Sequence, residues 1–263
     1  MTRPIRLRPR AAVTLLLASV GGLAAFLWPL IVQPGAALES TSAPLVFALL
    51  LPVLLAVVLA EMSEGGMDTK ALAMLGVLSA IGAALRPLGA GTAGIETVFF
   101  VLILGGRVFG PGFGFVLGAM TMFSSALLTG GVGPWLPFQM LGAAWVGLGA
   151  GALPRAGGKV ELALLVSYSA ISSLLYGALL NLSFWPFALG EHTQLSFDAH
   201  AGVLANLHAF FLFTLATSLG WDVGRALTTA VLVLITGPAV LAALRRAARR
   251  AAFEAPVEFV TAT

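Results

Sequence analysis

Cysteine is absent from this 263-residue chain, which also holds only two tyrosines and three histidines. The absence of cysteine excludes disulfides, zinc–thiolate sites and thiol catalysis. Charge is scarce too, because Asp, Glu, Lys and Arg make up only 10% of the residues, and no polar stretch is long enough for a second, soluble domain. The remainder is 59% hydrophobic with a mean hydropathy of +1.01, which is typical of a membrane protein.

Motifs of the common enzymes are missing as well. The chain has no G-x-x-x-x-G-K-[ST] loop for nucleotide phosphates, no H-E-x-x-H, no G-x-S-x-G and no clustered carboxylates. The histidines, His192, His200 and His208, are eight residues apart, and the first two fall in a polar loop, which is weak support for a metal site. We therefore expect no enzyme activity, no metal, no cofactor and no ATP hydrolysis by this chain itself.

Basic residues gather in two clusters beside apolar runs. Eight of the fourteen lie there: Arg3, Arg6, Arg8 and Arg10, then Arg245, Arg246, Arg249 and Arg250. Such clusters indicate membrane topology and contacts with lipid phosphates, and without interleaved aromatic residues they do not indicate nucleic-acid binding. Because basic flanks stay on the cytoplasmic side, we expect both termini to be cytoplasmic in a multi-pass protein of the plasma membrane.

The apolar residues form nine segments, at about 11–32, 44–60, 71–86, 95–107, 112–128, 136–152, 160–181, 201–218 and 226–244. Two cytoplasmic termini require an even number of crossings, so one segment does not cross. The best candidate is 201–218, which follows a polar loop and contains His208; we expect it to lie in the outer interface or to re-enter over a site.

The prediction is therefore an all-α, polytopic helix bundle with four parts. A basic cytoplasmic segment, 1–10, precedes an extra pair of transmembrane helices, 11–60. A six-helix core with the one interfacial or re-entrant helix follows over 71–245, and 246–263 forms a cytoplasmic tail. Nearly all the intramembrane polarity lies in this core, which places the function there.

Charged residues flank a Gly-rich loop near the start of the core. Arg86 precedes Pro87, which ends the helix, and the loop LGAGTAG then leads to Glu96. Arg86 and Glu96 either pair to clamp the two helix ends or contact a ligand together with Thr92. Both interpretations remain open, because ionisable groups within a membrane are expensive and often functional.

Three small residues, Gly76, Ala80 and Ala84, recur every fourth position on the helix before this loop. The spacing places them on one face, where another helix approaches closely. That face serves either internal packing or docking of a partner membrane subunit.

Polar and aromatic residues also recur at the outer ends of later helices: Trp135, Phe138, Gln139, Tyr176, Asn181 and Trp185, with Trp221, Asp222 and Arg225 at the start of the last helix. A membrane-interface belt accounts for the tryptophans, and Asp222 and Arg225 have the spacing of a local helical pair. The alternative is a shared pocket, since aromatic surface with a few polar groups suits a vitamin-sized ring.

Two stretches of the sequence resemble a known family. The stretches 71–152 and 217–240, including RPLGAGTAGIETVFFVLILGG and TSLGWDVGRALTTAVLVLITGPAV, are similar to the substrate-binding S components of energy-coupling factor (ECF) vitamin transporters. The resemblance implies a six-helix core that binds a vitamin near the outer face. It also implies docking through Gly76, Ala80 and Ala84 onto a transmembrane coupling subunit that is driven by two ATPases, with residues 87–95 as a gating loop.

The resemblance leaves the substrate open. The candidate pocket carries little net charge, which suits a neutral heterocycle such as riboflavin, a pyrimidine precursor or cobalamin. Similarity to actinobacterial members favours cobalamin. The alternative function is a stand-alone secondary permease for a small heterocyclic metabolite, which predicts ionisable groups along a midplane path rather than at the outer ends.

Overall fold

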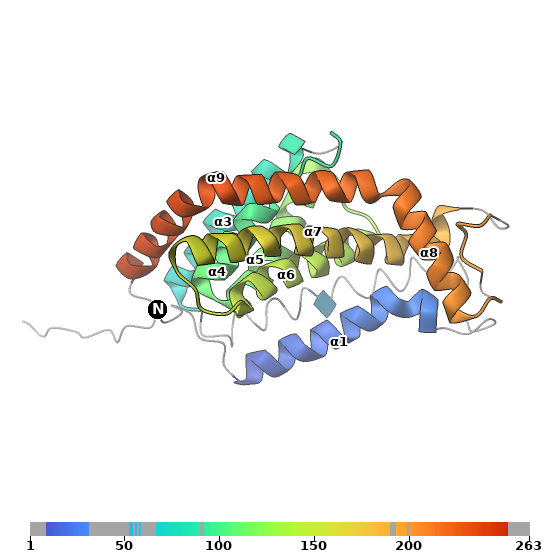
Figure 1. Ribbon diagram of the computed structural model, residues 1–263. Helices are drawn as coiled ribbons and strands as arrows, with labels where there is room; N and C mark the ends of the chain where they lie inside the picture. Colours follow the sequence, from blue (N-terminus) through green and yellow to red (C-terminus); the bar gives the residue numbers. More distant parts are fainter. Residues whose placement is uncertain are drawn as a thin grey trace, which may run out of the picture.

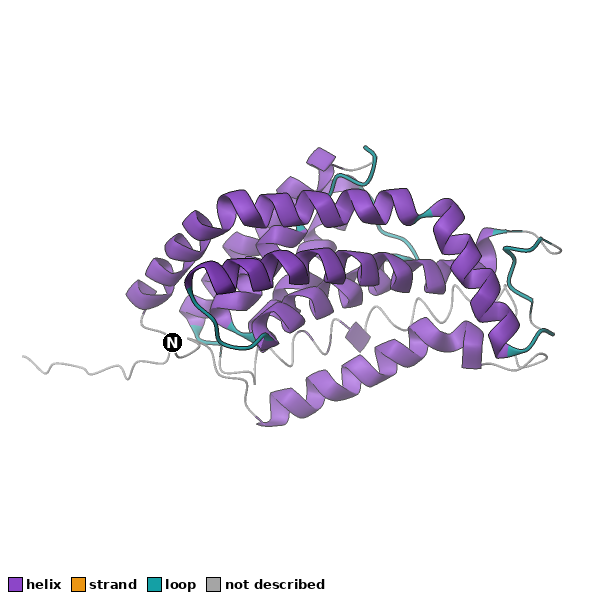
Figure 2. Ribbon diagram, in the orientation of Figure 1, coloured by secondary structure: helices purple, strands orange, loops and turns teal. Residues whose placement is uncertain are grey.

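The computed structural model describes residues 9–31, 53, 54, 56, 58, 67–89, 92–189, 193–198 and 200–251. The described residues form helices joined by short loops and contain no strand (Figures 1 and 2). The helices are α1 (Pro9–Ile31), α3 (Thr69–Gly89), α4 (Phe99–Phe109), α5 (Pro111–Thr129), α6 (Leu136–Ala152), α7 (Gly158–Ala188), α8 (Val203–Thr217) and α9 (Leu219–Ala251). The predicted all-α helix bundle is confirmed.

Five of these helices are long and apolar enough to cross a membrane: α1, α3, α5, α7 and α9. Helix α6, with 17 residues, is slightly shorter, and α4 has only 11. At 1.5 Å per residue α4 extends about 16 Å, roughly half of a hydrocarbon core of about 30 Å. Helix α4 therefore begins partway into the bundle, at the fully buried Phe99, and the loop before it runs inward from exposed residues such as Thr92.

Helices α4, α5 and α6 form the centre of the core. Gly110 joins α4 to α5 at φ +111°, a conformation that favours glycine, and Pro111 starts α5 at the first position, where its missing N–H costs nothing. Small residues then bring the three helices into backbone contact. A Cβ added at Gly106 or Gly114 would strike the carbonyl of Gly147, and one at Gly118 would strike the carbonyl of Ala143. We call this contact the glycine seam.

Helix α1 packs against the outside of this core. Its Phe26 is fully buried, with its ring centroid 4.9 Å from that of Phe138 on α6. The indole nitrogen of Trp145, also on α6, donates to Ser19 Oγ at 3.0 Å. Of the predicted second extra helix, 44–60, residues 53, 54, 56 and 58 are helical and the others lie outside the described residues.

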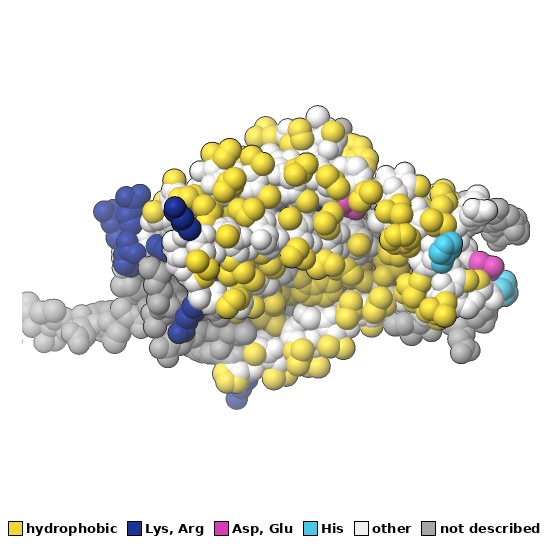
Figure 3. All heavy atoms as spheres, viewed as in Figure 1, with side chains coloured by type: hydrophobic (Ala, Val, Ile, Leu, Met, Phe, Trp, Pro, Cys, Tyr) yellow, Lys and Arg dark blue, Asp and Glu magenta, His cyan; other side chains and the backbone are white. Residues whose placement is uncertain are grey.

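The two ends of the bundle differ in charge. At one end, which we call the basic end, α9 finishes with Arg245, Arg246, Arg249 and Arg250, and Lys70 of α3 donates to the carbonyl of Ala251 at 2.7 Å. Figure 3 shows Lys and Arg side chains at this end, histidine and acidic side chains at the other, and hydrophobic side chains over most of the face between them. This is the surface expected of a multi-pass membrane protein.

Helix α8 lies at the opposite end, at an angle to α7 and α9 (Figure 1). Below it, the fully buried Trp185 contacts Phe197 and Phe210, each with centroids 5.4 Å away, and donates from its indole nitrogen to the carbonyl of Leu195 at 2.6 Å. Asn206 of α8 holds the adjoining loop through the backbone of Asp198. Segment 201–218 thus caps the end of the bundle and does not run alongside the long helices.

Candidate binding site opposite the basic end

Arg86 lies in the last turn of α3 and links three helices. One guanidinium nitrogen donates to Oε1 of Gln139 in the first turn of α6 at 3.0 Å, and another lies 3.5 Å from Oγ of Ser125 on α5. The amide nitrogen of Gln139 makes no hydrogen bond within the described part of the chain. The amide oxygen of Gln139 is therefore paired with Arg86, while its amide nitrogen remains available as a donor.

A second polar group lies between α7 and α9. Arg225 donates to Oδ1 of Asp222 at 2.7 Å and to the carbonyl of Ser173 at 3.4 Å. Gly177 makes room for Asp222, because a Cβ at that position would strike the carboxylate. The Arg225 guanidinium also sits 5.3 Å from the centroid of the Tyr176 ring, close enough for a cation–π interaction.

The loop between α3 and α4 closes over both groups. Ala93, at φ +45°, and Gly94, at φ +76°, form a tight turn whose backbone packs against Trp221 and Gly224 at the start of α9. A non-glycine residue with positive φ is strained and persists only where its surroundings hold it. Further along, Thr97 donates to the carbonyl of Leu85 at 2.6 Å, which ties the loop to the end of α3.

This loop places Glu96, half-buried, among the charges of both groups. Burial raises the pKa of the Glu96 carboxyl, and the positive charges of Arg225 and, more weakly, Arg86 oppose that shift. Glu96 forms no direct ion pair among the described residues, and Arg86 hydrogen-bonds to Gln139 in preference to it. The predicted clamp between Arg86 and Glu96 is therefore not a direct ion pair, and these two residues interact only through their charges.

Two buried polar atoms of these groups, Nε of Arg225 and Oγ of Ser173, lack hydrogen-bond partners among the described residues. Leaving such groups unpaired costs about 1–3 kcal/mol each, and a ligand that supplies matching donors and acceptors recovers part of that cost. We call the set Arg86, Glu96, Ser125, Gln139, Ser173, Tyr176, Asp222 and Arg225 the polar cluster. Its two guanidiniums and two carboxyls balance in formal charge.

The polar cluster brings together Arg86, Glu96, Gln139 and Tyr176 of the residues predicted from sequence. The other five lie elsewhere. Trp135 is 55% exposed and bonds to its own loop at Gly131, Thr92 is exposed, and Phe138 faces α1. Trp185 and Asn181 lie toward α8, where Asn181 Oδ1 accepts from Ser218 Oγ at 3.0 Å.

Two members of the polar cluster could not be singled out from the sequence. Ser125 and Ser173 lie inside apolar helices, and only the packing of α5 on α3 and of α7 on α9 brings them to the arginines. The spacing of Asp222 and Arg225 predicts a local helical pair, and this pair forms. No pattern in the sequence indicates that α7 at Gly177, or the 92–98 loop at Gly224, approaches α9 closely.

The comparison with protein families identifies the core. A family model described as "ECF transporter, substrate-specific component" matches residues 70–244, from the start of α3 to within the last two turns of α9. No curated protein and no solved structure matches the chain. The match covers more than half of the chain, so the resemblance noted in the sequence is confirmed. This all-helical, multi-pass membrane protein belongs to the family of substrate-specific components of ECF transporters.

Proposed function

We propose that this subunit captures a neutral, vitamin-like heterocycle in the polar cluster and presents it to an ECF importer. The observation that carries the proposal is convergence: α3, α5, α6, α7, α9 and the 92–98 loop all bring polar side chains to one end of an otherwise apolar bundle. Unused hydrogen-bonding capacity in the same place supports a ligand site over a purely structural network.

The orientation follows from the distribution of arginines. Basic flanks remain cytoplasmic, so we place the basic end and both termini in the cytoplasm and the polar cluster near the outer face. Substrate then reaches the cluster from outside, below the 92–98 loop and α8. In this arrangement the loop, which overlaps the predicted gating segment 87–95 at residues 92–95, is the part that has to move. Residues 87–89 belong instead to the end of α3, which continues through Pro87.

The balanced charge of the polar cluster supports an uncharged ring with both donors and acceptors. The family resemblance favours cobalamin. The short contacts within the cluster favour instead a ring the size of riboflavin or a pyrimidine precursor, because a corrinoid has to displace more of the surrounding loops. A binding panel therefore includes all three compounds.

The experiment is mass spectrometry of small molecules retained by the chain after gentle purification, followed by titration with that panel. We expect one heterocycle to be recovered and to bind tightly. Recovery of none, with no tight binding across the panel, contradicts the capture proposal. Uptake into vesicles by this chain alone, without ATPases, supports the alternative of a stand-alone permease.

ECF substrate-specific components work with a transmembrane coupling subunit and ATPases. We propose that the subunit docks through Gly76, Ala80 and Ala84, which are all exposed on α3 beside the exposed Val77 and Ile81. A Cβ at Gly76 meets no atom of the described residues within 4 Å, so the described part of the chain leaves this face open. Replacing Ala80 by Trp is expected to abolish uptake and to leave ligand binding intact. Equal loss of both contradicts the docking role.

A further inference from the structure

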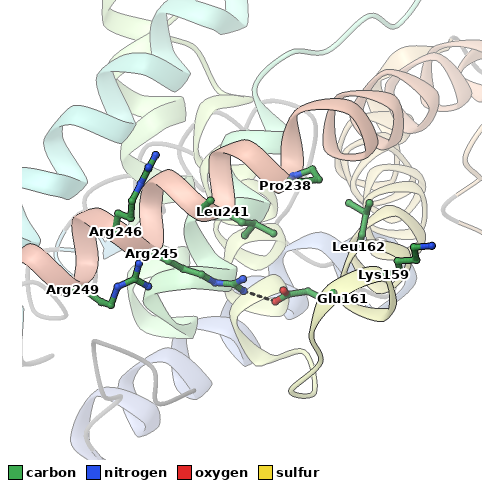
Figure 4. Close-up of a pocket in the computed structure, with 10 residues that line it drawn as sticks. Lys159, Glu161, Leu162, Pro238, Leu241, Arg245, Arg246 and Arg249 are labelled. Atoms are coloured by element: carbon green, nitrogen blue, oxygen red, sulfur yellow. Dashed lines mark hydrogen bonds and ion pairs between the residues drawn. The ribbon is translucent and has the colours of Figure 1, made fainter.

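A pocket lies at the basic end, away from the polar cluster. It has a volume of about 560 Å³ and opens between the start of α7 and the last third of α9 (Figure 4). That volume is within the range of about 300–1,000 Å³ that is typical of small-molecule sites. Neither the proposed capture of a substrate nor the docking face on α3 uses this pocket.

Positive charge dominates one part of its wall. Four cationic side chains line it, Lys159, Arg245, Arg246 and Arg249, against the single carboxylate of Glu161. Arg245 is held by Glu161 at 2.6 Å (Figure 4). Lys159, Arg246 and Arg249 have no ion pair or side-chain hydrogen bond within the described residues and are all exposed.

The start of α7 adds to this charge. Its cap residue, Gly157, supplies no side-chain hydrogen bond, and Gly158, which lines the pocket, has open space where a Cβ would lie. The first backbone N–H groups of a helix lack partners within the helix and carry partial positive charge, so they favour an anion. Free cations and uncapped N–H groups therefore face the same hollow.

The other part of the wall is apolar and open to lipid. Leu162, Pro238 and Leu241 continue the pocket away from the arginines (Figure 4). Pro238 and Arg249 are eleven residues apart, so the pocket extends about 16 Å along α9. The neighbouring side chains Val160 and Ile235 are 70% and 71% exposed, as expected of a surface that contacts acyl chains. A soluble anion would make no favourable contact with this apolar half of the pocket.

We propose that this pocket binds an anionic phospholipid of the leaflet at the basic end, with the phosphate headgroup among Lys159, Arg246 and Arg249 and an acyl chain along Leu162 and Pro238. Basic pockets between transmembrane helices at this depth suit such headgroups. Arg245 is a positioning residue: its bond to Glu161 ties α9 to α7 and sets the width of the pocket.

The test is native mass spectrometry of the full chain in detergent, titrated with short-chain phosphatidylglycerol, phosphatidylcholine and inorganic phosphate. We expect phosphatidylglycerol to bind well above phosphatidylcholine. Replacing both exposed arginines, Arg246→Gln with Arg249→Gln, is expected to weaken that binding about 25-fold, at about fivefold per charge. The matched control, Arg10→Gln with Arg155→Gln, removes two exposed charges outside the pocket and is expected to change binding less than twofold.

A second variant keeps the charges and fills the space. Ala242 lines the pocket and is exposed, so Ala242→Trp is expected to block the lipid without unfolding the chain, which a thermal unfolding curve checks. Equal binding of the two lipids, unchanged phosphatidylglycerol binding in both variants, or displacement of the lipid by millimolar phosphate each overturns the proposal. The last result identifies a free-phosphate site instead.

Discussion

Both ends of the bundle bury charged side chains, but they satisfy them differently. At the basic end, Oε1 of Glu161 accepts from Arg107 at 2.7 Å and from Arg245 at 2.6 Å. The remaining donors of Arg107 reach three backbone carbonyls in the α6–α7 loop, those of Leu153, Pro154 and Ala156. In the polar cluster, by contrast, Glu96 has no direct partner in the described structure, and Nε of Arg225 is buried and unpaired.

The contrast separates a structural ion pair from a binding site. A buried pair repays its desolvation only when its remaining hydrogen-bonding groups are also satisfied, as those of Arg107 are. Groups that are left partly unsatisfied cost stability, so a protein that keeps them is expected to use them. Substitutions at Glu161, Asp222, Gln139 and Glu96 test whether the two ends differ in this way.

The largest effect is expected at the basic end. Glu161→Gln removes the carboxylate that Arg107 and Arg245 share and leaves Arg107, whose side chain is 7% exposed, without a counterion among the described residues. We expect a loss of about 3 kcal/mol in the free energy of unfolding, measured by thermal or denaturant unfolding of the purified chain. Lys159→Gln, two residues away and exposed, is the control and should shift it by less than about 0.5 kcal/mol. Similar small shifts in both variants would show that the network is not structural.

A smaller loss is expected when the pair beside Tyr176 is weakened. Asp222→Asn keeps the volume against Gly177 but removes the charge from the hydrogen bond to Arg225. We expect a loss of about 2 kcal/mol in stability without ligand. The same variant should also bind the substrate more weakly, because Arg225 then lacks a fixed position. A change in stability with unaltered affinity would exclude this pair from the site.

Replacing Gln139 is expected to change the affinity for the ligand rather than the stability of the chain. Gln139→Leu removes the acceptor of Arg86 and the free amide donor, so we expect ligand affinity to fall about tenfold while the unfolding temperature changes little. Isothermal titration measures the affinity. The matched control is Gln194→Leu, the same chemical change at an exposed position of the loop before α8. Unchanged affinity in Gln139→Leu would remove this residue from the site.

The smallest effect, and one of opposite sign, is expected at Glu96. Because burial raises the pKa of this carboxyl, its ionised form destabilises the folded chain at neutral pH. Glu96→Gln should therefore raise the unfolding temperature slightly at pH 7. The difference from the unaltered chain should shrink as the pH falls below the ordinary pKa of a glutamate, where both side chains are neutral. A lower unfolding temperature at pH 7 would show that Glu96 is a structural ion, like Glu161.

Much of the fold could be predicted from hydropathy, since the long helices coincide with apolar runs. The ends of helices were harder to place. Helix α7 continues past the predicted end at 181 to Ala188, because Trp185 is buried under the loop before α8 and extends the apolar face. Helix α9 begins at Leu219, close to the predicted start at Trp221, Asp222 and Arg225, and Asp222 and Arg225 pair within its first turns. Segment 95–107 begins its helix only at Phe99.

The types of residue in the site could be predicted from the sequence, but their interaction partners were harder to predict. Arg86 and Glu96 could be singled out because they are ionisable residues beside a Gly-rich loop. The free-energy cost of placing such residues in a membrane can be judged from the local sequence alone. That Arg86 bonds to Gln139, 53 positions away, depends on how α3 and α6 pack, which no local pattern encodes. For the same reason Trp185 and Phe138, which have the composition of pocket residues, instead anchor α8 and α1.

The glycine seam has a mechanical consequence. Backbones that already touch leave no room for sliding, so α4, α5 and α6 must behave as one rigid block throughout any transport cycle. The conformational changes that accompany substrate binding and release are then expected outside this block, at the turn of Ala93 and Gly94 and at α8. Spectroscopic labels placed there will report motion, and labels on the block will serve as its fixed reference.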